Sequence, residues 1–315
     1  MMDDPGRFGR ALFVCAGLSL FSGCSAIPQQ QGDREWPCFT LEAEKTFLLN
    51  TPAGGRFDAS GLLLTPTGDL LTVSDRGPTL YRIEFNGVSA DLKPVTNCFT
   101  TSQLAPLRPA GGGHYDCEGI AEDGQGRFYL CEEVNRRVLR CDPKAKQVES
   151  LLIDWSPVQH FFGSDQNASF EGIAIGGGRL YVANERSSPL IMVVDPASLK
   201  VIDHFVVSPQ VNSFLGFLHY SDLSWQDGKL FVLCRHHRVV LEVDPRTYTV
   251  VAEFDYREIE EKLGYRTAYP TGLMEGLAVD RNFIWLVTDN NGLGRERSPN
   301  DTRPTLLKCA RPDKK

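Results

Sequence analysis

The sequence contains no block of basic residues and none of the short motifs that mark common catalytic sites. Its 315 residues carry a formal net charge of −7. Nucleic-acid binding needs a clustered positive surface, so we expect no nucleic-acid partner. The Gly-x-Ser-x-Gly elbow, His-Glu-x-x-His, the phosphate-binding loop and the dinucleotide fingerprint are all absent. An enzymatic function would therefore depend on a metal ion and on charged side chains rather than on one of these motifs.

Long apolar runs are also absent after the first 24 residues. Arg7 and Arg10 precede the apolar run 11–20, which has the layout of a secretory signal. This run is too short for a comfortable transmembrane helix of about 20 residues, although a plain N-terminal signal anchor is the alternative. The end of the segment 1–24 resembles the lipobox of bacterial lipoproteins, with Cys24 as the lipidated residue. This resemblance implies a bacterial cell-envelope protein, periplasm-facing or extracellular, held at the membrane only by its lipid.

The rest of the chain is predicted to form a tether and one domain. Residues 25–36 are polar and rich in Gln, and a segment of this composition is expected to be mobile. Residues 37–315 have the aromatic and aliphatic content of a globular protein. A repeat that continues through this region favours a single domain.

The repeat is marked by a polar residue that precedes a short apolar run. Successive marks are separated by 50 to 58 residues, a period typical of the four-stranded blade of a β-propeller. The marked residues are Ser60, Glu118, Glu171, Ser221 and Glu275. Five marks predict an all-β, five-bladed β-propeller of four-stranded blades.

Each mark is followed by the same local pattern of strand, Gly-containing hairpin, strand and polar corner. Third strands are predicted to end at Asp142-Pro143, Asp195-Pro196 and Asp244-Pro245, because proline donates no hydrogen bond to a sheet. The last mark is followed by only three clear strands. The segment 38–49 is the natural fourth strand, and this closure of the ring by an N-terminal strand would remove two exposed sheet edges.

Nine cysteines suggest disulfides in an oxidising compartment. If the segment 38–49 closes the ring, Cys38 and Cys309 lie on neighbouring strands and are able to pair. Cys117, Cys131 and Cys141 fall on three successive strands of the second blade, and their pairing stays open. Several cysteines are alternatively buried small apolar residues.

The repeat also predicts a cation site. First strands of propeller blades line the central channel, so the five marked residues are expected to converge on the axis. Carboxylates about 5 Å apart repel by about 3 kcal/mol per pair at an effective dielectric constant near 20. Protons or a cation must therefore neutralise Glu118, Glu171 and Glu275. Oxygen ligands without His or Cys favour Ca²⁺, with Ser60 and Ser221 completing the set.

The order Ser, Glu, Glu, Ser, Glu, together with Phe-Glu-Gly-Ile-Ala at 170–174 and Met-Glu-Gly-Leu-Ala at 274–278, resembles the SdiA-regulated and esterase-like phytase-type propeller families. It is more distantly similar to the five-bladed calcium-activated nucleotidases, the apyrases. The resemblance covers roughly residues 55–295. It implies one calcium ion in the central tunnel.

A second ring is expected 14 or 15 residues after each mark, where second strands end at the mouth of the channel. Its members and their neighbours are the candidates for catalysis, namely Asp75, Glu132, Glu185, Arg235, His236 and Asp289. The candidates for binding an anionic ligand are Arg76, Arg136, Arg186, Arg235 and Asn290. A solvated polar rim is the alternative for any one of them.

These observations favour a calcium-dependent hydrolase of phosphoric or other esters. The alternative is a non-catalytic binding or scaffold propeller in which calcium only stiffens the ring, because a fold does not determine an activity.

Overall fold

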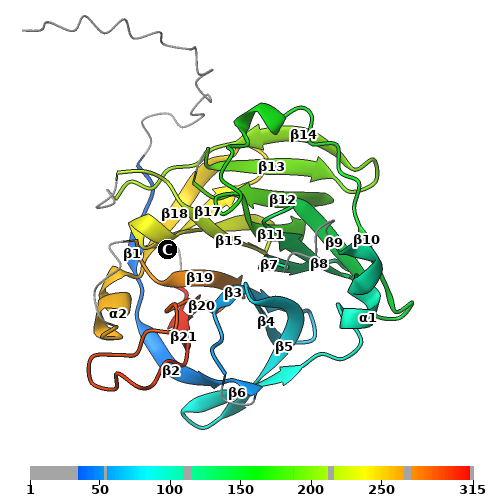
Figure 1. Ribbon diagram of the computed structural model, residues 1–315. Helices are drawn as coiled ribbons and strands as arrows, with labels where there is room; N and C mark the ends of the chain where they lie inside the picture. The colour runs from blue at the N-terminus through cyan, green and yellow to red at the C-terminus, as the bar shows by residue number, and fades with distance from the viewer. Residues whose placement is uncertain are drawn as a thin grey trace, which may run out of the picture.

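The computed structural model describes residues 35–52, 55–108, 115–186, 188–211, 216–265 and 271–312. The predicted signal peptide, Cys24 and residues 25–34 of the predicted tether lie outside these ranges. The described chain is all-β with a propeller-type arrangement, in which sheets surround a common centre (Figure 1). None of the helices in these ranges is both long enough and apolar enough to cross a bilayer.

The strands form antiparallel groups that follow one another along the chain. The first group is β3 (Ala59–Leu64), β4 (Leu70–Ser74), β5 (Gly77–Asn86) and β6 (Ser89–Pro94). The second is β7 (Cys117–Glu122), β8 (Phe128–Glu132), β9 (Arg137–Asp142) and β10 (Gln147–Ser150). The third is β11 (Phe170–Gly176), β12 (Arg179–Asn184), β13 (Leu190–Asp195) and β14 (Lys200–Phe205).

The next group is β15 (Tyr220–Gln226), β16 (Lys229–Cys234), β17 (Val239–Asp244) and β18 (Thr249–Asp255). The last is β19 (Met274–Val279), β20 (Phe283–Thr288) and β21 (Thr305–Ala310). Short helices occupy some of the connections, namely α1 (Thr101–Leu104), η2 (Ala105–Leu107), η3 (Gln159–Phe161), η4 (Arg235–His237) and α2 (Arg257–Lys262).

Third strands end where the Asp-Pro pairs predict. β9, β13 and β17 end at Asp142, Asp195 and Asp244. Each aspartate side chain then accepts a hydrogen bond from a backbone N–H of the following turn, for example Lys144 N–H to Asp142 at 2.9 Å and Arg246 N–H to Asp244 at 3.0 Å. The aspartate stabilises the turn and the proline ends the sheet ladder.

The N-terminal strand β2 (Ala43–Asn50) joins the last group of strands to the first. It pairs antiparallel with β21, where Leu48 lies opposite Thr305, and parallel with β6, where Leu49 lies opposite Ala90. The result is one eight-stranded sheet that contains β19 to β21, β2 and β3 to β6. The predicted closing strand is therefore confirmed for residues 43–49.

The beginning of the predicted closing strand has a different partner. β1 (Cys38–Thr40) pairs parallel with β18, where Cys38 lies opposite Glu253. Cys309 lies on β21 opposite Ala43. The proposed Cys38–Cys309 disulfide is therefore wrong, because the two residues belong to different sheets, and both cysteines are free.

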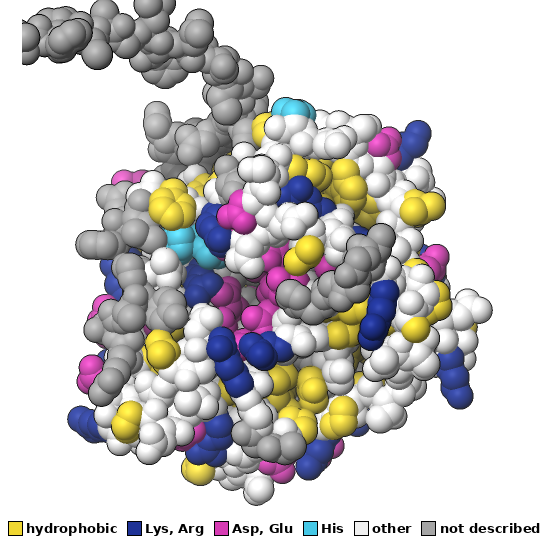
Figure 2. Space-filling model, viewed as in Figure 1, with side chains coloured by type: hydrophobic (Ala, Val, Ile, Leu, Met, Phe, Trp, Pro, Cys, Tyr) yellow, Lys and Arg dark blue, Asp and Glu magenta, His cyan; other side chains and the backbone are white. Residues whose placement is uncertain are grey.

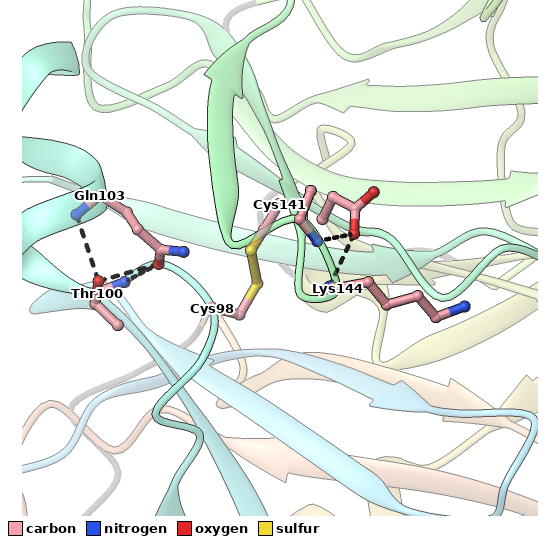
Figure 3. Close-up of a disulfide and its surroundings, with 7 residues drawn as sticks. Cys98, Thr100, Gln103, Cys141 and Lys144 are labelled. Atoms are coloured by element: carbon pink, nitrogen blue, oxygen red, sulfur yellow. Dashed lines mark hydrogen bonds between the residues drawn. A yellow bond between two sulfur atoms is a disulfide. The ribbon is translucent and has the colours of Figure 1, made fainter.

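The disulfide in the described chain joins Cys98 to Cys141, whose Cα atoms are 5.9 Å apart (Figure 3). Cys117 and Cys131 are free and buried. The helix that follows Cys98 begins with a capping box: the Thr100 side chain accepts from Gln103 N–H at 3.3 Å, and the Gln103 side chain accepts from Thr100 N–H at 2.9 Å. The disulfide ties the connection between β6 and β7 to β9 of the second group.

The apolar core is divided into clusters that lie between consecutive groups of strands. One cluster combines Tyr181 and Ile191 with Tyr220 and Leu241 from the next group. Another combines Leu306 of β21 with residues of β3 and β4, across the joint between the two ends of the chain. Packing of each sheet against its neighbours positions the first strands around the centre.

The first strands β3, β7, β11, β15 and β19 meet at this centre, each against the next and β19 against β3. Every one of them has a β-bulge at its marked residue. The following residue is glycine in four strands, and a Cβ added to Gly61 or Gly119 would lie 2.5 Å from the carbonyl oxygen of Glu118 or Glu171. The bulges turn the marked side chains inward, and the glycines permit the backbones to touch.

In the remaining first strand, Asp222 replaces this glycine. Its side chain is fully buried and accepts hydrogen bonds from the backbone N–H groups of Leu62 at 3.2 Å, Leu277 at 2.7 Å and Leu223 at 2.8 Å. Burial raises the pKa of Asp222 well above its usual range. One side chain thus links three first strands.

We predict that Gly119→Ala destabilises the fold by about 1 to 3 kcal/mol, because the new methyl group overpacks against backbone that has no room to move. Urea denaturation measures the change in the free energy of unfolding. Gly124→Ala is the matched control, since nothing lies within 4 Å of a Cβ at Gly124. Equal stability of the two variants would contradict the close approach at the centre.

Candidate functional site

Three sets of equivalent residues surround the open end of the centre. The first is the set of marked residues, which we call the inner ring: Ser60, Glu118, Glu171, Ser221 and Glu275. The second follows the ends of the second strands, and we call it the mouth ring: Asp75, Glu133, Glu185, Arg235 and Asp289. The third precedes each mark by two residues: Asp58, Asp116, Ser169, His219 and Leu273.

Backbone hydrogen bonds prove that these positions are equivalent. The N–H of each mouth-ring residue donates to the carbonyl oxygen of the third set, as in Glu133 to Asp116 at 2.9 Å and Glu185 to Ser169 at 2.7 Å. The same bond joins Arg235 to His219 at 3.0 Å. The end of each second strand is therefore held directly above a marked residue.

The rings enclose a cavity of about 630 Å³. Figure 2 shows acidic side chains at the floor of this hollow and basic side chains around its edge. Of the predicted inner ring, Ser60, Glu118, Glu171 and Glu275 line the cavity. Ser221 is buried at the corresponding position of β15, and its hydroxyl is among the described side-chain groups without a hydrogen-bond partner.

Carboxylates crowd one side of the cavity. Oxygen atoms of Asp116, Glu118 and Glu133 lie within 4.8 Å of one another, and so do those of Glu133, Glu171 and Glu185. We call these five residues the carboxylate cluster. Burial raises the pKa values of Glu118 and Glu171 well above the usual range, and it raises that of Glu133 to about 8. Repulsion from the neighbouring carboxylates contributes to the rise in all three.

The opposite side of the cavity carries its own positive charge. Arg235 forms an ion pair with Glu275, and its Nε donates to the carbonyl oxygen of Gly272 at 3.0 Å. The sequence places Arg235 among the candidates for catalysis and for binding an anionic ligand. The structure shows the ion pair.

A chain of hydrogen-bonding groups extends from Glu185 into the interior. Its Oε1 atom forms an ion pair with Arg186 and lies 2.7 Å from Nε2 of His219. Nδ1 of His219 lies 2.7 Å from Nε2 of His236. Burial raises the pKa of Glu185 to about 7, whereas it lowers that of His219 well below its usual range and that of His236 to about 3. The buried histidines are therefore neutral at physiological pH.

A second acidic group lies across the mouth. Burial, followed by repulsion from Asp58 and Asp289, raises the pKa of Asp75 to about 7. Asp58 forms ion pairs with Arg56 at 2.7 Å and Arg76 at 3.3 Å. The side chain of Arg76 is 55% exposed, so it is free to meet a ligand from solvent.

Several predicted site residues do not line the cavity. Glu132 was expected at the mouth, but that position belongs to Glu133, whereas Glu132 is buried against Arg137 at 3.0 Å. The error has a physical cause: the hairpin 123–127 between β7 and β8 is longer than the turn at 177–178 between β11 and β12. The number of residues between the marked residue and the mouth-ring residue therefore differs between these two groups of strands.

Arg136, Asn290 and His236 also lie behind the cavity lining. Arg136 donates to the carbonyl oxygen of Gly163 at 2.7 Å, and Asn290 donates to that of Thr302 at 3.0 Å, so both support loops. Glu133 is one of the neighbours of the predicted second ring, and it lines the cavity. Asp116 was missed as a member of the site, although it precedes the marked residue Glu118 by two positions.

The fold and the site together define a propeller-type β protein with an acid-lined central cavity. The chain belongs to the Phytase-like family, described as "Esterase-like activity of phytase", whose model matches residues 53–292. The expected membership of an esterase-like phytase-type family is thus confirmed. A search of curated proteins finds no match to this chain.

The chain is also similar to solved structures. Glutaminyl cyclase from Myxococcus xanthus is 15% identical, with 89% of this chain and 100% of that chain covered and a TM-score of 0.55. The PQQ-bound aldose sugar dehydrogenase from Streptomyces coelicolor is 14% identical, with 85% and 98% covered and a TM-score of 0.45. The likeness to the glutaminyl cyclase, at 15% identity, concerns the fold alone.

We predict that, in the presence of a chelator, the melting temperature falls as pH rises from about 5 to about 8. The pKa of Glu133 is raised from 4.5 to about 8 in the folded chain. Between these two pH values the unfolded chain has released the proton that the folded chain still holds, so the free energy of unfolding falls as the pH rises. Glu133→Gln removes one such group and should flatten the fall. Thermal unfolding of this variant, beside the exposed control Glu84→Gln, measures the effect; parallel curves for all three proteins would refute it.

Proposed function

We propose that this protein is a five-bladed β-propeller that binds Ca²⁺ in its central cavity and hydrolyses phosphoric or other esters. The closed circle of β3, β7, β11, β15 and β19 supports five blades. The observation that carries the functional proposal is the carboxylate cluster, because so many buried acids in contact must be neutralised. The family description supports ester hydrolysis.

The donor atoms suit a hard cation. Glu118 and Glu171 supply carboxylate oxygens from two neighbouring first strands, and Asp116 and Glu133 supply others beside them. The buried Ser221 hydroxyl has no hydrogen-bond partner among the described residues. Calcium takes six to eight oxygen ligands in flexible geometry. We place the ion nearer this side of the cavity than the sequence predicted, since Glu275 is paired with Arg235. When bound, the cation would polarise an ester oxygen.

The chain's own residues supply the remaining functions. Asp75 and Glu185, with pKa values of about 7, are able to take or give a proton near neutral pH, which suits general acid–base catalysis. Arg76 and Arg186 provide positive charge at the mouth for an anionic ester.

We further propose that the protein is anchored in the bacterial cell envelope through lipid on Cys24. The disulfide Cys98–Cys141 supports an oxidising compartment. Metabolic labelling with a fatty acid, compared between the native sequence and Cys24→Ala, tests the anchor.

Calcium should raise the melting temperature of chelator-treated protein, because an ion that binds only the native state stabilises it by about 2.7 kcal/mol at a hundredfold excess over Kd. Glu118→Gln and Glu171→Gln should each lose most of this increase, since each removes a charged ligand. Glu84→Gln is the exposed control and should respond as the wild type does. A melting temperature that ignores calcium in the wild type would exclude the site.

Ester hydrolysis is tested with nucleotides, phytate, simple phosphate monoesters and carboxylic esters, each with calcium and with chelator. We expect calcium-dependent turnover of at least one class, reduced at least tenfold in Asp75→Asn or Glu185→Gln. Asp75→Asn, which lies outside the carboxylate cluster, should keep the calcium-induced rise in melting temperature. Stabilisation by calcium without turnover of any substrate would instead favour a binding or scaffold propeller.

A further inference from the structure

Arg235 stands where the rest of the mouth ring is acidic. Its backbone makes the same hydrogen bond as its equivalents, yet its side chain carries the opposite charge. Its exposure is only 11%, and it contacts Glu275, whose exposure is 12%. A guanidinium this deep in an acidic cavity is an internal counter-ion rather than part of a solvated rim.

The side chain of Arg235 is held by its ion pair with Glu275 and by the backbone at Gly272. Nε donates to the carbonyl oxygen of Gly272, and a Cβ added to Gly272 would lie 2.7 Å from the carbonyl oxygen of Arg235. Gly272 has a φ of +82°, which favours glycine. The backbone near Gly272 is therefore shaped around Arg235.

The charge of Arg235 reaches beyond its ion pair. It lowers the pKa values of Glu171, Glu185 and Asp289 against the larger effect of burial. Oε2 of Glu185 and Oε2 of Glu275 are buried and have no hydrogen-bond partner among the described residues. Glu185 is only 2% exposed. A bound metal ion contacts carboxylate oxygens on several sides. If an arginine took the place of such an ion, some of these oxygens would be left without a partner, as Oε2 of Glu185 and Oε2 of Glu275 are.

We propose that the Arg235 guanidinium occupies the position of a second divalent cation, with Glu275 and Glu185 as its acidic walls. The cavity accordingly takes one calcium ion beside Glu118 and Glu171 in the native protein, and two when the charge of Arg235 is removed. This inference rests on the proposed calcium site. It assigns Arg235 as the residue that determines how many ions the cavity holds.

Calorimetric titration of chelator-treated protein with calcium chloride tests the assignment. The wild type should bind one ion and Arg235→Gln two, whereas Arg235→Lys keeps the charge and should bind one. Arg137→Gln is the matched control, because Arg137 also pairs with a buried glutamate, Glu132, but lies outside the cavity lining. It should bind one ion.

A folded Arg235→Gln that binds the same number of ions as the wild type overturns the assignment, and so does a wild type that binds two. If the wild type binds none and Arg235→Gln binds one, the assignment stands and the proposed native calcium site fails. If Arg235→Gln does not fold without calcium, circular dichroism should show calcium restoring its fold. Failure of calcium to do so, while Arg235→Gln/Glu275→Gln folds, also overturns the assignment.

Discussion

The close approach of the first strands around the centre is the constraint on which the rest of the structure depends. Backbone of one strand touches backbone of the next at Gly61, Gly119, Gly172 and Gly276, and no side chain fits between them. Each strand therefore bulges at the preceding residue and turns that side chain into the cavity. The geometry that closes the ring thus also places buried acids next to one another.

The electrostatic consequences differ between the two sides of the cavity. Near Glu118 and Glu133 the described residues place carboxylate against carboxylate, and pKa values rise because burial and repulsion act in the same direction. Near Glu275 the positive charge of Arg235 relieves the same crowding. The pseudosymmetric scaffold thus carries an asymmetric site, in which acid faces acid on one side and an arginine pairs with an acid on the other. Function is commonly found where a regular scaffold carries such variation.

Asp222 and the joint through β2 solve a related problem, since a ring built from one chain must be closed. Asp222 connects three first strands near the centre through backbone N–H groups. At the periphery, β2 connects the last group of strands to the first through main-chain pairing on both of its edges. A substitution that disturbs either position should also change the geometry of the cavity, because the same first strands support the inner ring.

The sequence by itself determined the repeat, the strand-ending Asp-Pro turns, the closing strand 43–49 and the inner-ring positions. These follow from local rules: the period of the marks, the chemistry of proline and the alternation of side chains along a strand. Only the tertiary structure decided that Glu133 rather than Glu132 reaches the mouth, that Cys98 pairs with Cys141, and that Arg235 neutralises Glu275. Hairpin length shifts one strand end against another, and pairs distant in the chain depend on how sheets pack. Neither quantity is recorded in the local pattern of residues.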